Sequence, residues 1–362
     1  MPDSFFNPAS AQKGRLILED GSEFTGFSFG YPKSVAGEVV FNTGMVGYPD
    51  SMTDPSYLGQ ILTVTYPLVG NYGIPDSNEQ DGLDRNFESS GIQIQALLVA
   101  DYSPEHSHWK SVRSLGNWLE SQQIPALTGI DTRALTKKLR DAGTMLGKIE
   151  IDSPIDFYDP NEENLVAKAS IREPVLYEGG PKKVALIDCG AKYNIVHSLR
   201  ERGLSVLRVP WNYDLSKENF DGLMVSNGPG DPQMCGETVA QIRGVIGRDI
   251  PVFGICMGHQ LLSMAAGAST YKLKFGHRSQ NQPVLEVGTN RCLVTSQNHG
   301  FAVDAGKLDR DWEEWFINLN DDTNEGIRHK SGRFMSVQFH PEATPGPVDA
   351  GYLFDRFREL IG

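Results

Sequence analysis

The chain has 362 residues and a formal net charge of −13, because 33 Lys and Arg residues stand against 46 Asp and Glu residues. At roughly 150 residues per domain, this length predicts two domains, or three, with cores large enough to fold without a disulfide or metal. A net negative chain without a basic block is a poor candidate for binding nucleic acid or an anionic membrane. We therefore expect neither partner.

The four cysteines predict no disulfide framework and no zinc site, since none are paired as Cys-x-x-Cys. Residues 1–10 have no basic start followed by an apolar run, so we expect no secretory signal there. No stretch approaches the roughly 18 consecutive apolar residues of a membrane helix. These patterns favour a reducing compartment, and we expect the cytoplasm.

The first part of the chain, residues 1–151, predicts a mixed α+β domain. Its expected elements are, in chain order, a hairpin turning at Asp20-Gly21, strands over 37–41 and 60–66, and helices over 111–122 and 131–142. Asp131 is a candidate N-cap for the last helix, and Gly143 is a candidate stop. Residues 152–181 carry repeated Pro and Gly with little periodicity, which predicts a connection between domains.

Residues 182–362 predict a doubly wound α/β domain, because short apolar strands alternate with helices. The expected strands are 183–188, 204–209, 222–226, 251–255, 292–295, 326–328 and 334–339, and the expected helices are 193–202, 238–247 and a segment after residue 256. Parallel strands connected in this way place their ligands at the carboxyl ends of the strands. Residues that follow these strands are therefore the first candidates for a site.

The strongest local signal is Gly254-Ile-Cys-Met-Gly258, which lies between an apolar strand and an apolar helix. This Gly-x-nucleophile-x-Gly pattern is typical of a nucleophile elbow, where a sharp turn raises the nucleophile above the sheet. The start of the helix favours a thiolate, and the amide of Met257 points to where an oxyanion would form. We therefore predict that Cys256 is a nucleophile; the alternative is a buried structural thiol.

A nucleophilic thiol needs a base and a group that orients the base, and His340-Pro-Glu342 can supply both. The tripeptide follows directly on the strand expected over 334–339. A spacing of two puts both side chains on the same side of an extended backbone, so Glu342 can hold and charge-pair with His340. Alone, such a tripeptide is usually a loop cap. Together with the elbow it predicts a Cys–His–Glu set.

Two further polar segments follow expected strands. Residues 226–232, Ser-Asn-Gly-Pro-Gly-Asp-Pro, predict a rigid loop whose accessible amides suit a developing negative charge or a substrate amide. No Gly-Lys-Ser/Thr follows, so it is not a phosphate loop, and a tight turn is the alternative. Residues 297–301, Gln-Asn-His-Gly-Phe, predict only a loop from their composition.

The segments at 226–232, 254–260 and 340–342 together resemble those of the class I, or triad, glutamine amidotransferases. Other segments resemble the small, glutamine-hydrolysing subunit of carbamoyl phosphate synthetase and the glutaminase domain of the multifunctional pyrimidine-biosynthesis protein. They lie at 37–44, 53–57, 65–71, 129–133 and 296–302. The resemblance runs from about Gly14 to the C-terminus, and its N-terminal part is specific, because the amidotransferases for GMP or anthranilate lack that domain. It implies a small-subunit N-terminal domain followed by a doubly wound amidotransferase domain.

The resemblance also implies an enzyme that hydrolyses L-glutamine and passes ammonia to a large synthetase partner, which makes carbamoyl phosphate from bicarbonate and ATP. It makes Cys256 the nucleophile, His340 the base and then the acid, and Glu342 the orienting group. The amides of Met257 and Gly228 would form the oxyanion hole. The residues that would hold glutamine are Ser56, Gly228, Gly230, Met257, Gln260, Asn298, Gly300 and Phe301. No metal or other cofactor is implied on this chain, since ATP and Mg²⁺ belong to the partner.

The chain departs from the family in small ways. Met257 stands where Leu is frequent, and residues 275–283 differ from the commonest family sequence. Some relatives replace the nucleophile with Ser and lose glutaminase activity, whereas this chain keeps Cys256. Two other hypotheses are a non-catalytic glutamine-sensing or scaffolding subunit and a cysteine peptidase on the same scaffold. His277 and His299 lie near the motifs, and the sequence assigns them no role.

Overall fold

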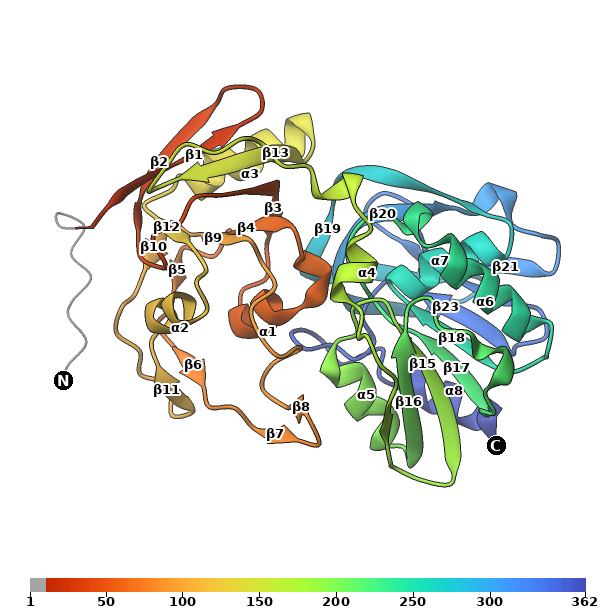
Figure 1. The fold of residues 1–362 in the computed structure, drawn as a ribbon. Coiled ribbons are helices and arrows are strands. Elements are labelled where there is room, and N and C mark those ends of the chain that lie inside the picture. Colours follow the sequence, from red (N-terminus) through yellow and green to blue (C-terminus); the bar gives the residue numbers. More distant parts are fainter. Residues whose placement is uncertain (1–10) are drawn as a thin grey trace. The chain divides into compact units, whose positions relative to one another are not determined.

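The computed structural model describes residues 11–362 (Figure 1); residues 1–10, where we expected no signal peptide, lie outside that part. The chain divides into two units, the first ending at Glu162 and the second beginning at Glu163. This division falls inside the connection expected over 152–181. That segment is more structured than its composition indicates, because Val175–Tyr177 pairs as an antiparallel edge strand in the sheet of the second unit.

The first unit is built on a closed barrel. The barrel strands are β1 (Lys13–Leu18), β2 (Glu23–Ser28), β3 (Val35–Asn42), β4 (Gln60–Val64), β9 (Ala96–Leu98), β12 (Ala126–Thr128) and β13 (Met145–Glu150). The elements outside the barrel are β5 (Leu68–Val69), β6 (Ile74–Pro75), β7 (Glu79–Gln80), β8 (Leu83–Asp84), β10 (Asp101–Tyr102), β11 (Ser111–Arg113), α1 (Tyr48–Thr53), α2 (Leu115–Ser121) and α3 (Thr132–Ala142). The barrel order is β1-β13-β3-β4-β9-β12-β2, so no barrel strand keeps an open edge.

Local sequence signals explain most boundaries in this unit. The hairpin between β1 and β2 turns at Gly21, whose φ of +83° is accessible to glycine at little cost. The α3 helix begins after Asp131, whose carboxylate accepts a hydrogen bond from the amide of Ala134 at 2.8 Å. The helix expected over 111–122 was wrong at its start. Ser114 caps α2 by accepting from the amide of Asn117, and the three residues before it form β11.

The second unit holds one large sheet with helices on both faces. Its strands are β14 (Val175–Tyr177), β15 (Lys182–Asp188), β16 (Leu204–Pro210), β17 (Gly222–Val225), β18 (Val252–Ile255), β19 (Ser269–Glu286), β20 (Cys292–Asp304), β21 (Trp312–Asn318), β22 (Asn324–His329) and β23 (Phe334–Val337). Its helices are α4 (Leu165–Ala169), α5 (Tyr193–Arg200), α6 (Gly236–Ile246), α7 (Met257–Ala265) and α8 (Tyr352–Ile361). The strand order is β14-β16-β15-β17-β18-β23-β22-β20-β19-β21, and β16, β15, β17, β18 and β23 run parallel. The doubly wound α/β prediction is confirmed.

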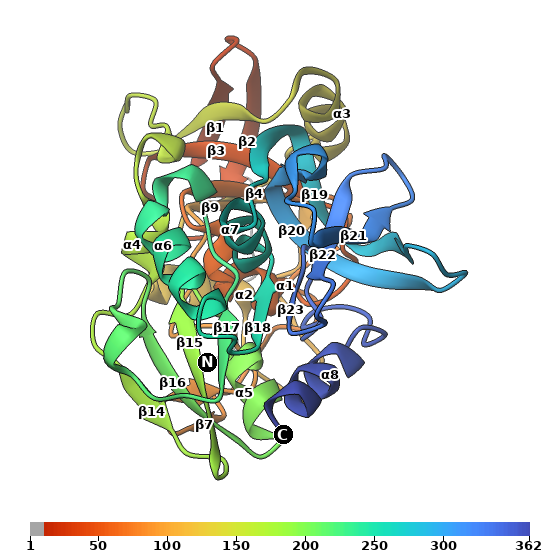
Figure 2. The same cartoon turned by 90° about the vertical axis from the view of Figure 1, so that its right-hand side faces the viewer.

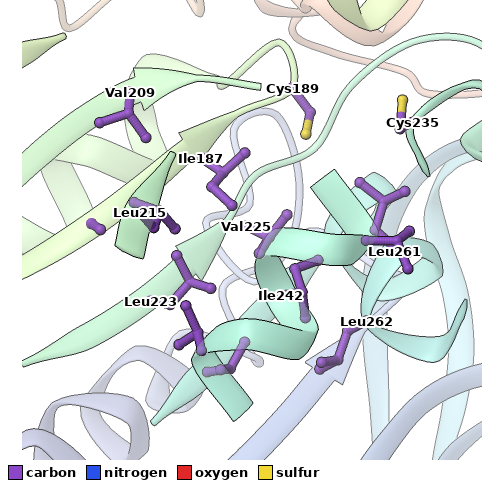
Figure 3. Packing of buried hydrophobic residues seen from close by; sticks show 14 of the residues in the cluster. Ile187, Cys189, Val209, Leu215, Leu223, Val225, Cys235, Ile242, Leu261 and Leu262 are labelled. Carbon is purple, nitrogen blue, oxygen red and sulfur yellow. The ribbon is translucent and has the colours of Figure 1, made fainter. Parts of the chain in front are cut away.

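Successive side chains along the central strands point to opposite faces of this sheet. Val252 belongs to the core shared with α6 and α7, whereas the next residue, Phe253, packs edge-on against Phe354 of α8 on the other face. Figure 2 shows α6 and α7 together over β17 and β18, with α8 set apart from them. The side chains labelled in Figure 3 include Ile187, Leu223 and Val225 of the strands and Ile242, Leu261 and Leu262 of the helices. No helix in residues 11–362 is both long and apolar enough to cross a bilayer.

The loop expected over 297–301 was wrong, because this segment lies inside β20. It pairs antiparallel with β19, so that His277 stands opposite His299 and Arg278 opposite Asn298. The segment is polar yet buried. A buried polar strand is tolerated when neighbouring strands satisfy its hydrogen bonds. Those partners come from distant parts of the chain, so composition alone could not reveal them.

Candidate active site

Cys256 lies at a sharp turn between β18 and α7. Its backbone φ is +54° and its ψ is −102°, a conformation that residues other than glycine rarely adopt. The Cys256 amide donates to the carbonyl of Val337, and the Gly258 amide donates to the carbonyl of Ser226, both at 2.9 Å. These bonds tie the turn to β23 and β17. The geometry matches the predicted nucleophile elbow, in which surrounding structure maintains backbone strain at a functional residue.

The two glycines of the elbow are required by close backbone approach. A Cβ added to Gly258 would lie 2.1 Å from the carbonyl oxygen of Val225. A Cβ added to Gly254 would lie 2.4 Å from the carbonyl oxygen of Gly258. Neither neighbour can yield easily, because both are backbone atoms. Any side chain at these positions would therefore push α7 away from the sheet and displace Cys256.

His340 and Glu342 lie beyond the end of β23 and form a buried pair. The Nδ1–H of His340 donates to Oε1 of Glu342 at 2.6 Å. Burial would lower the pKa of His340, but the charge of Glu342 and the Cys256 thiol raise it to about 10. The Cys256 thiol thus contributes to the raised pKa of His340. Nε2 of His340 makes no hydrogen bond of good geometry to any of the described residues. Nε2 is thus the nitrogen that can accept the thiol proton.

The Cys256 thiol is itself buried, with 2% of the residue exposed. Its Sγ donates to the carbonyl oxygen of Asn298 at 3.7 Å, which places β20 beside the sulfur. The second unit therefore brings together the three predicted catalytic residues and part of the predicted substrate set. Their source elements are the α7 turn, the end of β23 and β20.

Lys192, at the N-terminus of α5, completes the charged group around Glu342. Its Nζ lies 3.1 Å from Oε1 of Glu342 and donates to the carbonyl of Thr344 at 2.7 Å, with both charged side chains buried. Burial would raise the pKa of Glu342, but Lys192 and His340 together lower it to about 2. Glu342 therefore stays a carboxylate and fixes the Nδ1–H tautomer of His340. Sequence reasoning missed Lys192. The feature that could have indicated it is its position between the end of β15 and the start of α5, at the ligand-binding edge of the sheet.

The expected oxyanion donors lie in two different elements. Met257 is the first residue of α7, and a helix leaves its first amides without an internal acceptor. Gly228 lies in the loop after β17, where a Cβ would stand 2.1 Å from the carbonyl oxygen of Cys189. Gly230 follows in the same loop at φ +82°, packed against Leu165. The joint action of the Met257 and Gly228 amides on one oxyanion stays a prediction.

The other expected glutamine contacts divide between the two units. Gln260 uses its Nε2 to donate to the carbonyl of Phe301 at 2.9 Å and to Oε1 of Gln338 at 3.1 Å. Asn298, Gly300 and Phe301 all lie in β20. Ser56 lies in the first unit, in a short 3₁₀ turn (Pro55–Tyr57), where its amide donates to Oδ1 of Asp54 at 2.9 Å. Glutamine binding by these residues stays a prediction.

One cluster in residues 11–362 has side chains of metal-ligating type. His277, His299 and Glu325 offer ligand atoms that all lie within 4.8 Å of one another. Burial would lower the pKa of His277, but Glu325 and Asp321 outweigh it and raise that pKa. Both ring nitrogens of His277 already face carboxylate oxygens, Nε2 at 2.9 Å from Asp321 and Nδ1 at 3.5 Å from Glu325. The chemistry of this set therefore fits an internal ion pair better than a metal centre.

Comparison with known proteins shows two family matches. Residues 185–360 match the class-I glutamine amidotransferase family, and residues 16–149 match the carbamoyl-phosphate synthase small chain, CPSase domain. A solved glutamine amidotransferase from Thermotoga maritima is 22% identical with a TM-score of 0.37, covering 44% of this chain and 76% of that chain.

Curated relatives are similar over nearly the whole of this chain. Human carbamoyl-phosphate synthase (ammonia), mitochondrial, is 49% identical and covers 97% of it; multifunctional protein CAD of Squalus acanthias is 53% identical and covers 95%. Multifunctional protein URA2 of Saccharomyces cerevisiae is 48% identical and covers 98%. The chain spans only 24%, 16% and 18% of the lengths of these three proteins. It belongs to the carbamoyl-phosphate synthase small-chain family, with a small-chain domain followed by a class-I glutamine amidotransferase domain.

Proposed function

We propose that this chain hydrolyses L-glutamine through a γ-glutamyl thioester on Cys256 and delivers ammonia to a partner that makes carbamoyl phosphate. Family membership does not decide this, because the name of the human relative specifies ammonia. The observation that carries the proposal is the strained Cys256 at the head of α7, beside the buried His340–Glu342 pair. A structural thiol would require neither a positive φ nor a polarised imidazole.

The first half of the reaction acylates the thiol. His340 takes the thiol proton at Nε2 as Sγ attacks the side-chain carbonyl carbon of glutamine, and the carbonyl oxygen becomes an oxyanion. The amides of Met257 and Gly228 stabilise that charge. The tetrahedral intermediate then expels its nitrogen, which takes the proton from His340 and leaves as ammonia. The raised pKa of His340 holds the proton on the ring until the leaving group needs it.

The second half releases glutamate. Water attacks the thioester carbonyl while His340 removes one of its protons, and the new intermediate expels Sγ, which regains that proton. Glu342 keeps the ring oriented in both halves, and Lys192 keeps Glu342 ionised. The thiol is restored, so the cycle balances with glutamine and water alone.

The proposal is tested by ammonia release from glutamine, with trapping of the thioester by mass spectrometry. We expect Cys256→Ala to abolish both signals. Cys292→Ala is the matched control, since Cys292 is exposed and should be replaceable without loss. Substantial glutamine hydrolysis by Cys256→Ala would overturn the assignment. Glutamine binding by the wild type without thioester would favour the sensing or scaffolding hypothesis, and cleavage of peptide substrates would favour a peptidase.

The partner we propose is the synthetase that makes carbamoyl phosphate from bicarbonate and ATP, with ATP and Mg²⁺ bound by that partner. Two facts support it: the small-chain family match and the much greater length of the relatives. We expect glutaminase activity to rise when the partner, ATP and bicarbonate are added together. Unchanged activity in a formed complex would contradict the coupling.

We also propose that Ser56 contributes to glutamine binding from the first unit, so that Ser56→Ala raises the KM for glutamine. The cytoplasm is our proposed compartment. All four cysteines are unpaired, as expected in a reducing compartment. Cell fractionation tests this proposal, and recovery with mitochondria would contradict it.

A further inference from the structure

A second charged cluster, largely buried, lies where β19, β20 and β22 meet. His277 of β19 is held between two carboxylates: its Nε2 is 2.9 Å from Oδ2 of Asp321, and its Nδ1 is 3.5 Å from Oε1 of Glu325. Glu325 is completely buried, whereas the Asp321 side chain is 40% exposed. Asn318 also donates to Oε1 of Glu325 at 3.0 Å. Neither the sequence motifs nor the thioester mechanism assigns these residues a role.

The two carboxylates favour the protonated form of His277. Burial lowers its pKa, but the hydrogen bond and charge of Glu325 and the charge of Asp321 raise it above the ordinary value. His299, opposite in the sheet, has its ring 4.9 Å from that of His277 in an edge-to-face contact. Burial, followed by the charge of His277, pushes the pKa of His299 well below its ordinary value. The surroundings therefore favour the protonated form of His277 and disfavour that of its neighbour His299.

The neutral His299 connects the cluster to the substrate strand. Its Nδ1–H donates to the carbonyl of Phe301 at 2.8 Å, the same oxygen that accepts from Nε2 of Gln260. Oε1 of Gln297 accepts from Nδ1 of His277 at 3.1 Å. Nε2 of His299, the ring nitrogen without a proton in this tautomer, also lies 3.1 Å from that oxygen, which is a contact and not a hydrogen bond. The carboxylates are thus connected through His277 to Gln297 and to the ring of His299 in β20, next to the segment expected to hold glutamine.

We infer that His277, Glu325 and Asp321 form a charged brace that holds residues 298–301 in their glutamine-binding position. They are positioning residues: they act on glutamine through β20 and do not touch the reacting sulfur. The inference rests on the proposed glutamine hydrolysis. It separates two tasks in one site, with proton transfer assigned to the His340–Glu342 pair and substrate position assigned to the brace.

The sharpest perturbation is Glu325→Gln, which removes a buried charge but keeps the shape and the oxygen that Asn318 bonds. His277 then keeps only the half-exposed Asp321 as counter-charge, so its cationic form is held less well. Because a charged hydrogen bond is worth tenfold or more in an equilibrium, we expect the KM for glutamine to rise about tenfold and kcat to change less than about threefold. Glu313→Gln on the neighbouring β21 is the matched control, since Glu313 pairs with Arg328 near the surface.

The pH dependence of KM supplies a readout that general loss of packing would not move. The brace holds while His277 is protonated, so KM should rise as pH increases through the His277 pKa. The groups facing His277 are Asp321, Glu325 and His299, with the uncharged Gln297 and Asn318. Asp321→Asn removes one stabilising carboxylate, so the rise should begin at lower pH. Asp321 is partly exposed, which makes this variant tolerant in folding and decisive if Glu325→Gln does not fold.

The possible results test the brace and the proposed glutaminase activity separately. No glutamine hydrolysis by the wild type defeats the proposed function itself. An active wild type with unchanged KM in both variants overturns the brace, and so does a loss confined to kcat. The rate of Cys256 alkylation by iodoacetamide should be the same in wild type, Glu325→Gln and Asp321→Asn. A large change in that rate would show that the cluster acts on the thiol, which also contradicts the inference.

Discussion

The elbow glycine Gly258 provides a prediction whose size follows from a single distance. In Gly258→Ala the new methyl would lie 2.1 Å from the carbonyl oxygen of Val225, whereas real contacts of this kind do not fall below 3.0 Å. The start of α7 must therefore move by at least the difference, 0.9 Å. A misplacement of about 1 Å can reduce catalysis by roughly 100-fold, and overpacking destabilises by about 1–3 kcal/mol. We expect losses of that order in kcat/KM for glutamine and in the free energy of unfolding.

The matched control is Gly244→Ala in α6, where an added Cβ meets no atom within 4 Å. Replacing an exposed helical glycine by alanine should leave activity unchanged and stabilise by up to about 1 kcal/mol. Glutaminase kinetics and urea unfolding of both variants make the comparison. Full activity in Gly258→Ala, with a stability equal to the wild type, would refute the argument that backbone contact positions the nucleophile.

Four further predictions concern the charged groups and the cluster around His277. Lys192→Met should lower kcat by about tenfold or more, because removing one partner of a buried ion pair leaves the charge of the other uncompensated. The acid limb of the kcat–pH profile should also move to higher pH, because Glu342 becomes easier to protonate. Glu342→Gln should reduce kcat less than His340→Ala, since an orienting group is lost rather than the proton carrier; equal or inverted losses would contradict those roles. In unfolding experiments, the raised pKa of His340 stabilises the folded state fully below about 6.5, and this stabilisation is lost as the pH rises through about 10. The lowered pKa of Glu342 stabilises the folded state above about 4.5, and this stabilisation is lost as the pH falls through about 2. His340→Ala should remove the alkaline part of this dependence. Dialysis against EDTA should leave the glutaminase rate unchanged, and a loss restored by zinc would instead make the cluster around His277 a metal site.

The candidate catalytic residues could be located from the sequence because their signals are local. The elbow needs only Gly254, Cys256 and Gly258 between a strand and a helix, and the close backbone contacts explain why those glycines stand there. His340 and Glu342 are two residues apart, so they lie close whatever the backbone does; the extended backbone we expected there was wrong, because the chain turns and the amide of Ala343 donates to the carbonyl of His340 at 3.1 Å. In each case a few consecutive residues contain the whole physical argument.

The parts that sequence reasoning missed depend on contacts between distant segments. Lys192 and Glu342 are 150 positions apart in the sequence, and no local pattern around either residue predicts their ion pair. Residues 297–301 suggest a loop because they are polar, yet β19 supplies their strand partners and they are buried. A buried polar side chain is recognised by its partners, and partners remote in sequence appear only once the sheet is formed.

The two buried clusters explain why His299 is neutral in a site that contains several charges. The charges of His277, Arg278 and His340 all oppose a proton on His299, in addition to its burial. A neutral ring that donates from Nδ1 to the carbonyl of Phe301 keeps one fixed tautomer, whereas a second cation here would repel the proton needed on His340. The neutral His299 therefore stands between His277 and His340, which becomes cationic when it takes the thiol proton. If proton transfer and substrate position are separate tasks, the effects of Glu325→Gln and Glu342→Gln on kcat/KM should multiply in the double variant, and a strong departure from that product would show that both clusters act as one unit.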